Sequence, residues 1–279
     1  MNNVLSVDVE DYFHVAALSQ TIKVADWPNI PPRVVNNTRR LLDLFDRRNV
    51  KATHFVLGWV AERFPDLVSE IDARGHEVAC HGYSHQLVYD QSPEVFHAET
   101  RKSKEILEDI LGKPVSGYRA ASYSITKKSL WALDILCELG FKYDSSIFPI
   151  HHDRYGIPDA EPLPHKLATP NGSQIVEFPL TTSSLLGVKM PAAGGGYFRL
   201  YPYALSRFLL RRVQKERKPI VFYLHPWEID YEQPRVKVSA LSTFRHYNNL
   251  DKCEKRLEQL LTDFDFTTME QSLRQQALL

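Results

Sequence analysis

Short apolar runs alternate along the chain with longer segments in which apolar residues recur every three or four positions. The short runs are rich in β-branched and aromatic residues, which predicts strands over 4–8, 52–57, 77–80, 117–120, 142–144, 175–178, 220–224 and 265–268. The longer segments predict helices over 34–48, 59–74, 93–111, 126–139 and 250–264. Strands that alternate with helices pair in parallel through crossover connections, and this number of units favours a closed α/β barrel over an open sheet.

Residues 145–203 break this rhythm. They are dense in Pro, Gly, Ser and His, and they end in the glycine run 194–196 followed by Tyr197 and Phe198. A loop of this length inside a compact domain is usually functional or an insertion. The glycine run lacks the Lys-Ser/Thr of a nucleotide-binding loop. We expect it to approach a ligand closely, with Tyr197 and Trp227 beside it, or else to be a packing turn.

Composition narrows the class of protein. The 279 residues include 34 Lys and Arg and 34 Asp and Glu, and this balance argues against nucleic-acid binding, which usually requires a basic excess. No apolar run approaches the roughly 18 residues of a membrane span. Acidic residues interrupt the first apolar run, so we expect no secretory signal, and three cysteines suit a reducing compartment. The expected location is cytoplasmic.

An acidic cluster follows the first predicted strand. Asp8 and Glu10 share one face by strand alternation, and Asp11 lies at the turn. Carboxylates this close repel one another unless a cation or a shared proton intervenes, so a metal site is one interpretation. The alternative is that they are solvated loop acids or a helix cap.

Two histidines, His81 and His85, follow the strand predicted at 77–80. They are four residues apart, so they can meet one ion if the segment turns as a helix does. Imidazole suits zinc and related first-row ions. They could also be two ordinary loop histidines. Together with a carboxylate from another strand end, however, they predict a His-His-carboxylate metal site.

Three further polar residues end predicted strands. His225 follows the strand at 220–224, where a general acid could reach the site. Arg119 could hold a catalytic carboxylate ionised, and Asp144 could orient a histidine. Each of these residues, taken alone, is more often structural.

In this order the motifs resemble those of the polysaccharide deacetylases with a NodB-homology domain, the family 4 carbohydrate esterases. The corresponding stretches are 6–11, 81–85, 119–122, 144–146 and the segment from Leu224 onward. The resemblance spans about residues 4–230 and implies a distorted (β/α)7-type barrel. It also implies hydrolysis of N-acetyl groups on an amino-sugar polymer, with Zn²⁺ or another divalent first-row ion.

The phrases Asp-Val-Glu-Asp-Tyr-Phe, Gly-Gly-Gly-Tyr-Phe-Arg, His-Pro-Trp-Glu-Ile-Asp and Phe-Arg-His-Tyr narrow the resemblance. They look like the subfamily found beside exosortase and exopolysaccharide biosynthesis genes. The implied organisation is a barrel over 1–230, with the insertion at 145–203, and a C-terminal extension over 231–279 that packs on it.

The resemblance also implies a role for each site residue, although the motifs depart from the usual pattern in places. Glu10 stands one residue later than the usual ligand, which leaves Asp11 as an alternative, and Ala121-Ser122 replaces Pro-Tyr. The implied metal ligands are Glu10, His81 and His85, the base is Asp8 held by Arg119, the acid is His225 oriented by Asp144, and the substrate contacts are Ser122, Tyr197 and Trp227.

Two other functions remain open at this point. A related amidase acting on a small cyclic amide or ureide would use the same barrel, and a non-catalytic carbohydrate-binding protein could have kept the fold. The non-catalytic alternative is disfavoured because the base, the metal ligands, the acid and the orienting residues are all present.

Overall fold

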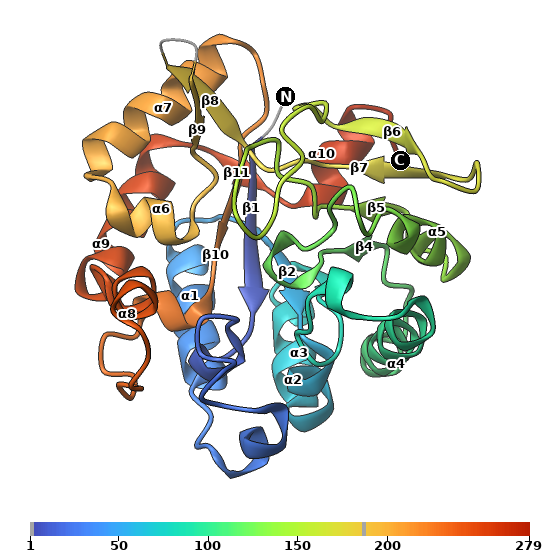
Figure 1. Ribbon diagram of the computed structural model, residues 1–279. Coiled ribbons are helices and arrows are strands. Elements are labelled where there is room, and N and C mark those ends of the chain that lie inside the picture. The colour runs from blue at the N-terminus through green and yellow to red at the C-terminus, as the bar shows by residue number, and fades with distance from the viewer. Residues whose placement is uncertain (1–2, 186–187) are drawn as a thin grey trace.

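The computed structural model describes residues 3–185 and 188–279 of the chain. Its centre is a curled sheet that begins with β1 (Asn3–Val9), every residue of which is buried (Figure 1). The strands lie in the order β10-β1-β2-β3-β4-β5-β7-β6, with β11 pairing the start of β1. Their bounds are β2 Thr53–Val56, β3 Glu77–Cys80, β4 Gly117–Tyr118, β5 Tyr143–Asp144, β6 His165–Ala168, β7 Gln174–Glu177, β10 Val221–Leu224 and β11 Phe266–Thr267.

Seven neighbouring strands, from β10 through β1 to β7, are parallel, which confirms the predicted α/β class. Only β6 in this sheet runs antiparallel, as the hairpin partner of β7. Within the described residues no ladder joins β6 to β10, so the sheet is a curled half-barrel and not a fully closed one. Because parallel strands align their carboxyl ends, the loops that follow β1, β3, β4 and β10 meet at one end of the sheet.

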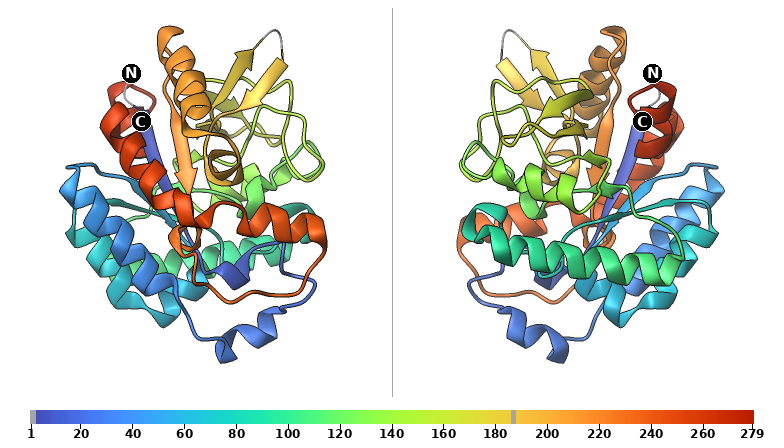
Figure 2. Two further views of the ribbon diagram at one scale, coloured as in Figure 1. Left: turned by 90° about the vertical axis from the view of Figure 1, so that its left-hand side faces the viewer. Right: turned by 90° about the vertical axis from the view of Figure 1, so that its right-hand side faces the viewer.

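Helices lie around the outside of the curled sheet (Figure 2). The predicted helix at 93–111 is confirmed as α4 (Pro93–Leu111), with the Ser92 hydroxyl capping its start and Gly112 in the left-handed conformation at its end. The segment predicted as one helix over 59–74 is instead two. Pro65 begins the second, because the residue before a proline avoids helical backbone. The helices along this part of the chain are α1 Val34–Arg47, α2 Gly58–Arg63, α3 Pro65–Ala73 and α5 Trp131–Glu138.

Short 3₁₀ turns occupy several of the connections. Their bounds are η1 Tyr12–His14, η2 Val24–Asn29, η3 Val88–Asp90, η4 Ala121–Tyr123 and η5 Pro226–Ile229. Three of them, η1, η4 and η5, directly follow the carboxyl ends of β1, β4 and β10.

The predicted insertion at 145–203 holds more regular structure than a loop. Besides β6 and β7 it contains a separate hairpin of β8 (Thr182–Leu185) and β9 (Val188–Pro191), and the short helix α6 (Gly195–Leu200). The hairpin and the following helix α7 (Tyr203–Lys215), which the sequence analysis missed, stand at one end of the molecule (Figure 2). Residues 186–187 of the insertion lie outside the described residues.

The glycine run packs against strand β10. Gly194 has φ +123° and forms an isolated parallel bridge with Tyr223, and a Cβ atom there would lie 2.1 Å from the Tyr223 carbonyl oxygen. Gly195 has φ +56°, and a Cβ atom there would meet the Tyr223 ring. Only glycine fits this close approach at both positions. The first two glycines therefore form a packing turn, whereas Gly196 and Tyr197 line the cavity described below.

The C-terminal part of the chain returns to the sheet. Its helices are α8 Ala240–Tyr247, α9 Leu250–Asp263 and α10 Met269–Gln275. Helix α9 packs on η5 and α7, and α10 packs on β1. The predicted division of the chain at residue 230 stays a prediction. No helix within 3–185 and 188–279 is long and apolar enough to cross a membrane.

Candidate active site

A cavity of about 390 Å³ opens at the carboxyl ends of the parallel strands. It is lined by residues far apart in the sequence, from the loops after β1, β3, β4 and β10 and from α6 and α8. The predicted site residues in its wall are Asp8, Glu10, His81, His85, Ser122, Tyr197, His225 and Trp227. The other two, Arg119 and Asp144, are fully buried.

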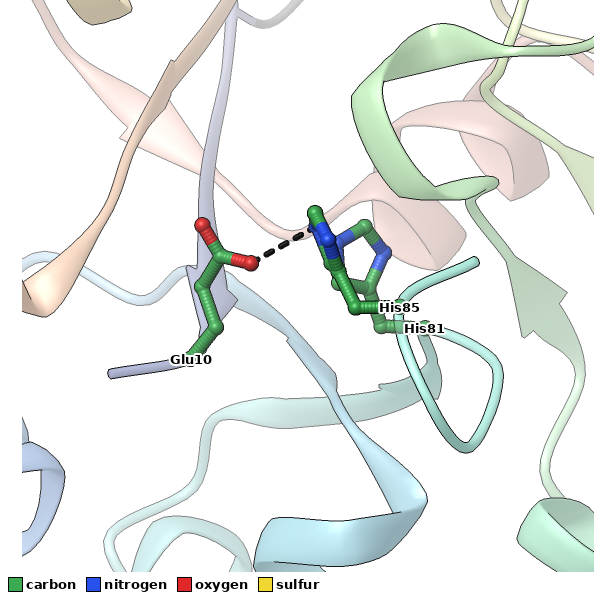
Figure 3. Close-up of side chains that lie close together, drawn as sticks. All are labelled: Glu10, His81 and His85. Carbon is green, nitrogen blue, oxygen red and sulfur yellow. Dashed lines mark ion pairs between the residues drawn. The ribbon is translucent and has the colours of Figure 1, made fainter. Parts of the chain in front are cut away.

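Glu10, His81 and His85 converge on one point of the wall (Figure 3). Each offers one donor atom, and these atoms lie within 4.8 Å of one another. Oε2 of Glu10 is 2.7 Å from Nε2 of His85. Two imidazole nitrogens and a carboxylate oxygen form the donor set of many divalent-metal sites with open positions, so the residues present fit such an ion.

The backbone orients both histidines. Nδ1 of His81 lies 2.8 Å from the carbonyl oxygen of Arg119, which places the proton on Nδ1 and leaves Nε2 free as a ligand. Burial lowers the pKa of His81 to about 4, so the ring is neutral, as metal binding requires. His85 has a left-handed backbone with φ +53°, a conformation uncommon for a non-glycine residue, and it turns this side chain back toward Glu10.

Asp11 lies outside this cluster because its carboxylate is engaged elsewhere. It accepts hydrogen bonds from the backbone N–H groups of Tyr12, at 2.9 Å, and of Arg33 and Val34, at 2.6 and 2.8 Å. Asp11 thus caps η1 and also fixes the start of α1. Between the two carboxylates that the sequence left open, the structure places Glu10 beside the histidines.

The variant Asp11→Ala is expected to lose stability and keep its metal ion, whereas Glu10→Ala is expected to lose the ion. Asp11→Ala leaves three backbone N–H donors without their acceptor, at about 1–3 kcal/mol each, so the free energy of unfolding falls by about 3 kcal/mol or more while the ion stays. Glu10→Ala removes a ligand and should release the ion. Urea denaturation and elemental analysis measure the two quantities. Loss of the ion from Asp11→Ala alone would contradict the assignment.

Asp8 and Arg119 form a buried ion pair beside the three clustered residues. Nη1 of Arg119 donates to Oδ1 of Asp8 at 2.7 Å, and neither side chain is more than 3% exposed. The remaining donors of the guanidinium bond Ser6 and Ser145, and its carbon lies 4.0 Å from the centre of the Phe55 ring. The arginine is therefore rigid, and it leaves Oδ2 of Asp8 directed toward the Tyr123 hydroxyl at 3.4 Å.

His225 lies beside Asp8 and Glu10, because its strand β10 pairs directly with β1. Its Nε2 is 3.8 Å from Oδ2 of Asp8 and 3.6 Å from Oε1 of Glu10. The carboxylate that meets its other nitrogen is Glu228, whose Oε2 lies 3.2 Å from Nδ1. Burial alone would lower the pKa of His225, but the Glu228 hydrogen bond and the nearby carboxylates raise it to about 9. The ring is therefore charged at neutral pH.

Asp144 ends strand β5, and its hydrogen-bond partners include its neighbour Ser146. Its oxygens accept hydrogen bonds from the hydroxyl of Ser146, at 2.6 Å, and from the backbone N–H of Ser146, at 3.2 Å. Burial raises its pKa to about 6. The carboxylate at Nδ1 of His225 is instead Glu228, from the turn η5, so the role of Asp144 in orienting His225 stays a prediction.

Comparison with known proteins finds matches over two parts of the chain. Residues 26–143 match the family model for polysaccharide deacetylases, and residues 145–274 match a domain of unknown function, DUF3473. A peptidoglycan deacetylase of Helicobacter pylori is 34% identical over 114 residues, which cover 41% of this chain and 37% of that relative. The matched segment is thus little more than a third of the relative.

Solved structures with the same fold cover nearly all of the chain. A Mycobacterium smegmatis protein proposed to be a polysaccharide deacetylase superposes with a TM-score of 0.65 at 20% identity, over 100% of this chain and 92% of that one. The Puue allantoinase superposes with a TM-score of 0.59 at 16% identity, over 98% and 88%. At these identities the likenesses show the fold alone.

The two matched segments supply different walls of the cavity. The segment that matches the deacetylase model carries His81, His85 and Arg119, whereas His225 and the two aromatic residues predicted to bind substrate belong to the DUF3473 segment. Tyr197 is half-buried in the wall. Trp227 is 5% exposed and donates its indole N–H to Oε1 of Glu10 at 3.2 Å, so it holds the carboxylate in addition to lining the cavity.

Ser122 lies in the cavity wall, in the turn η4 that follows β4. It and Tyr123 have φ of +50° and +55°. Two successive left-handed non-glycine residues are strained and require support from the surrounding structure. Both residues line the cavity.

Sequence reasoning missed several residues of the cavity. Tyr123 and Tyr223 pack edge to face beside Asp8, with ring centres 5.0 Å apart, and His246 stacks on Trp227 at 4.4 Å. Tyr223 precedes His225 by two residues on β10, so strand alternation could have found it. His246 comes from α8, which the sequence analysis did not predict, although the phrase Phe-Arg-His-Tyr contains it.

Proposed function

We propose that the protein is a metal-dependent hydrolase that removes N-acetyl groups from an amino-sugar polysaccharide, with an exopolysaccharide as the substrate. The observation that carries the proposal is the joint presence, in one cavity, of the Glu10-His81-His85 cluster, the Asp8–Arg119 pair and His225. Peptide-like amides hydrolyse slowly in water, and this set supplies the groups that the reaction needs.

Glu10, His81 and His85 would hold Zn²⁺ or another divalent first-row ion. Such an ion, when bound, acidifies a water molecule and polarises the acetamide carbonyl group. Asp8 accepts the proton of the attacking water at Oδ2, while Arg119 occupies Oδ1 and keeps the group a carboxylate before the reaction.

His225 supplies the proton that the leaving group needs. Its Nε2 donates a proton to the sugar nitrogen as the C–N bond breaks and the electron pair goes to that nitrogen. The products are acetate and a free amino sugar. Without this proton the leaving group would be an amide anion, which is too basic to depart. A backbone N–H near Ser122 would stabilise the oxyanion.

The substrate assignment draws support from the cavity wall. Tyr197 is a half-buried aromatic residue of the wall on the DUF3473 side, and an aromatic face suits the apolar face of a sugar ring. The overall neutrality of the chain, with 34 charges of each sign, fits a neutral acetylated polymer. The sequence phrases shared with the exopolysaccharide subfamily support an exopolysaccharide as the substrate. Because the H. pylori relative is a peptidoglycan deacetylase, peptidoglycan is the substrate to test beside it.

The test is acetate release by the purified protein after addition of Zn²⁺, Co²⁺ or Mn²⁺. N-acetylglucosamine oligomers should release acetate, whereas cyclic imides and ureides such as allantoin should remain intact. Peptidoglycan and an acetylated exopolysaccharide serve as polymer arms. Ureide hydrolysis would favour the amidase alternative. A protein that binds no ion and releases no acetate from any polymer would favour the non-catalytic alternative.

A further inference from the structure

Three of the phrases that distinguish this sequence meet at His225. Arg199 ends the Gly-Gly-Gly-Tyr-Phe-Arg phrase, Glu228 belongs to His-Pro-Trp-Glu, and residues 244–247 form Phe-Arg-His-Tyr. The side chains of Arg199 and Glu228 are 2% and 1% exposed, and Nε of Arg199 donates to Oε1 of Glu228 at 2.6 Å. None of these residues lies in the segment 26–143, which matches the deacetylase family model.

The two oxygens of the Glu228 carboxylate contact different residues, Arg199 and His225. Oε1 faces Arg199, while Oε2 accepts the backbone N–H of His225, at 3.0 Å, and faces its Nδ1, at 3.2 Å. Burial alone would raise the pKa of Glu228, but the charge of Arg199 and the hydrogen bond of His225 lower it to about 2. Glu228 is therefore a carboxylate that fixes one nitrogen of the imidazole and turns the other, Nε2, to the cavity.

The fold in turn fixes Arg199. Its Nη1 donates to the carbonyl oxygens of His246 and Asn248, at 2.8 and 2.9 Å, and its Nη2 to that of Arg245, at 3.1 Å. These carbonyls lie at the carboxyl end of α8, where helix carbonyls lack intrahelical partners. A cation at this end of the helix is also favoured by the helix dipole. The guanidinium is thus locked by several hydrogen bonds at once.

Stacking on the Trp227 ring also fixes the plane of the His225 imidazole. Trp227 stacks on His225, with ring centres 5.1 Å apart and an interplanar angle of 21°, and on His246, at 4.4 Å and 18°. The Arg199 guanidinium lies 5.2 Å from the centre of the Trp227 ring. His225 is therefore held in its plane by stacking and along its edge by Glu228.

We propose that Glu228, fixed by Arg199 and the end of α8, is the positioning residue for proton donation by His225. This inference rests on the proposed deacetylase function. As the C–N bond breaks, the Nε2 proton passes to the sugar nitrogen, and the Nδ1 proton stays on the ring, bonded to Glu228. The DUF3473 segment thus completes the proton donor, and Asp144 has no part in it.

The leaving group distinguishes this role from a structural one. An amide needs the proton from His225, whereas an activated aryl ester such as 4-nitrophenyl acetate expels a stable phenolate without it. Glu228→Gln should lower kcat on N-acetylglucosamine oligomers by about 10²- to 10⁴-fold. The same variant should keep kcat on the aryl ester within about threefold of wild type, with metal content unchanged.

The matched control is Asp144→Asn, the carboxylate that the sequence had suggested. It should change the two rates in equal proportion. Equal loss on both substrates in Glu228→Gln, or a selective loss of amide hydrolysis in Asp144→Asn instead, would overturn the inference. If the wild type hydrolyses no acetamide at all, the proposed function fails and not this assignment.

Glu228→Gln leaves the buried Arg199 charge unpaired, which can prevent folding. The double variant Glu228→Gln/Arg199→Met removes both charges, and exchanging a buried ion pair for uncharged side chains is often neutral in stability. The double variant should show the same selective loss of amide hydrolysis. Amide turnover close to that of wild type in this variant would overturn the inference.

Discussion

His81→Ala is expected to release the bound divalent ion and to lower acetate release by more than about 10³-fold. The imidazole is one of only three protein donors in the cluster, and its replacement leaves a carboxylate and a single histidine. A metal-activated water and a polarised carbonyl group together account for several kcal/mol of transition-state stabilisation, at about 1.4 kcal/mol for each tenfold change in rate.

Elemental analysis of the purified variant, after dialysis against Zn²⁺, measures the ion independently of activity. His97→Ala is a matched control, since His97 lies on the outer surface of α4, 3.5 Å from Glu138, and its loss should change neither quantity. A His81→Ala protein that keeps one ion per chain would show that the ligand assignment is wrong. Circular dichroism establishes that the variant is folded.

Asp8→Asn is expected to keep the ion and to lose about 10²- to 10⁴-fold in kcat. The amide side chain has the shape of the carboxylate and can still accept a hydrogen bond from Arg119 through its oxygen, but it cannot take up the proton of water. Because this substitution leaves the buried Arg119 without its counter-charge, it also lowers stability. Turnover is therefore measured well below the unfolding temperature of the variant.

Asp159→Asn serves as the control for Asp8→Asn. Asp159 is 68% exposed and pairs with Lys127 at the surface, so its loss should affect neither kcat nor stability measurably. Retention of wild-type turnover by a folded, metal-loaded Asp8→Asn protein would exclude Asp8 as the base. In that case the role would pass to another oxygen at the same wall.

Residue pattern was sufficient to predict the seven neighbouring parallel strands, β11 and the polar residues that follow several of these strands, but it did not predict β6, β8 or β9. Each strand of a parallel sheet ends at the same edge, so Asp8, Glu10, His81 and His225 had to approach one another once the α/β class was recognised. The helix at 93–111 was predicted to the residue because Ser92, Pro93 and Gly112 are local signals that act within one turn.

Other elements depended on contacts that the sequence does not display. Helix α7 and helix α8 were missed, although α7 buries Leu209, Leu210 and Val213. The glycine run had two interpretations until Tyr223 was seen to occupy the space where a Cβ atom would lie. A neighbour 29 residues away decides that conformation, and no local rule contains it.

The sequence by itself determined which chemical groups the chain brings to one edge of the sheet, because side-chain alternation along a strand is local and the succession of strands and helices implies parallel pairing. Tertiary structure alone decided which of the neighbouring acids lies in the metal cluster and which one caps a helix. Asp11 is excluded from the metal cluster by three backbone N–H groups, two of them from the start of α1. The spacing of Glu228, three residues after His225 with Pro226 opening the turn, was a signal in the sequence. The buried Glu228 carboxylate requires a buried partner. That partner is Arg199, whose Nε lies 2.6 Å from Oε1 of Glu228, and only the fold brings the two residues together.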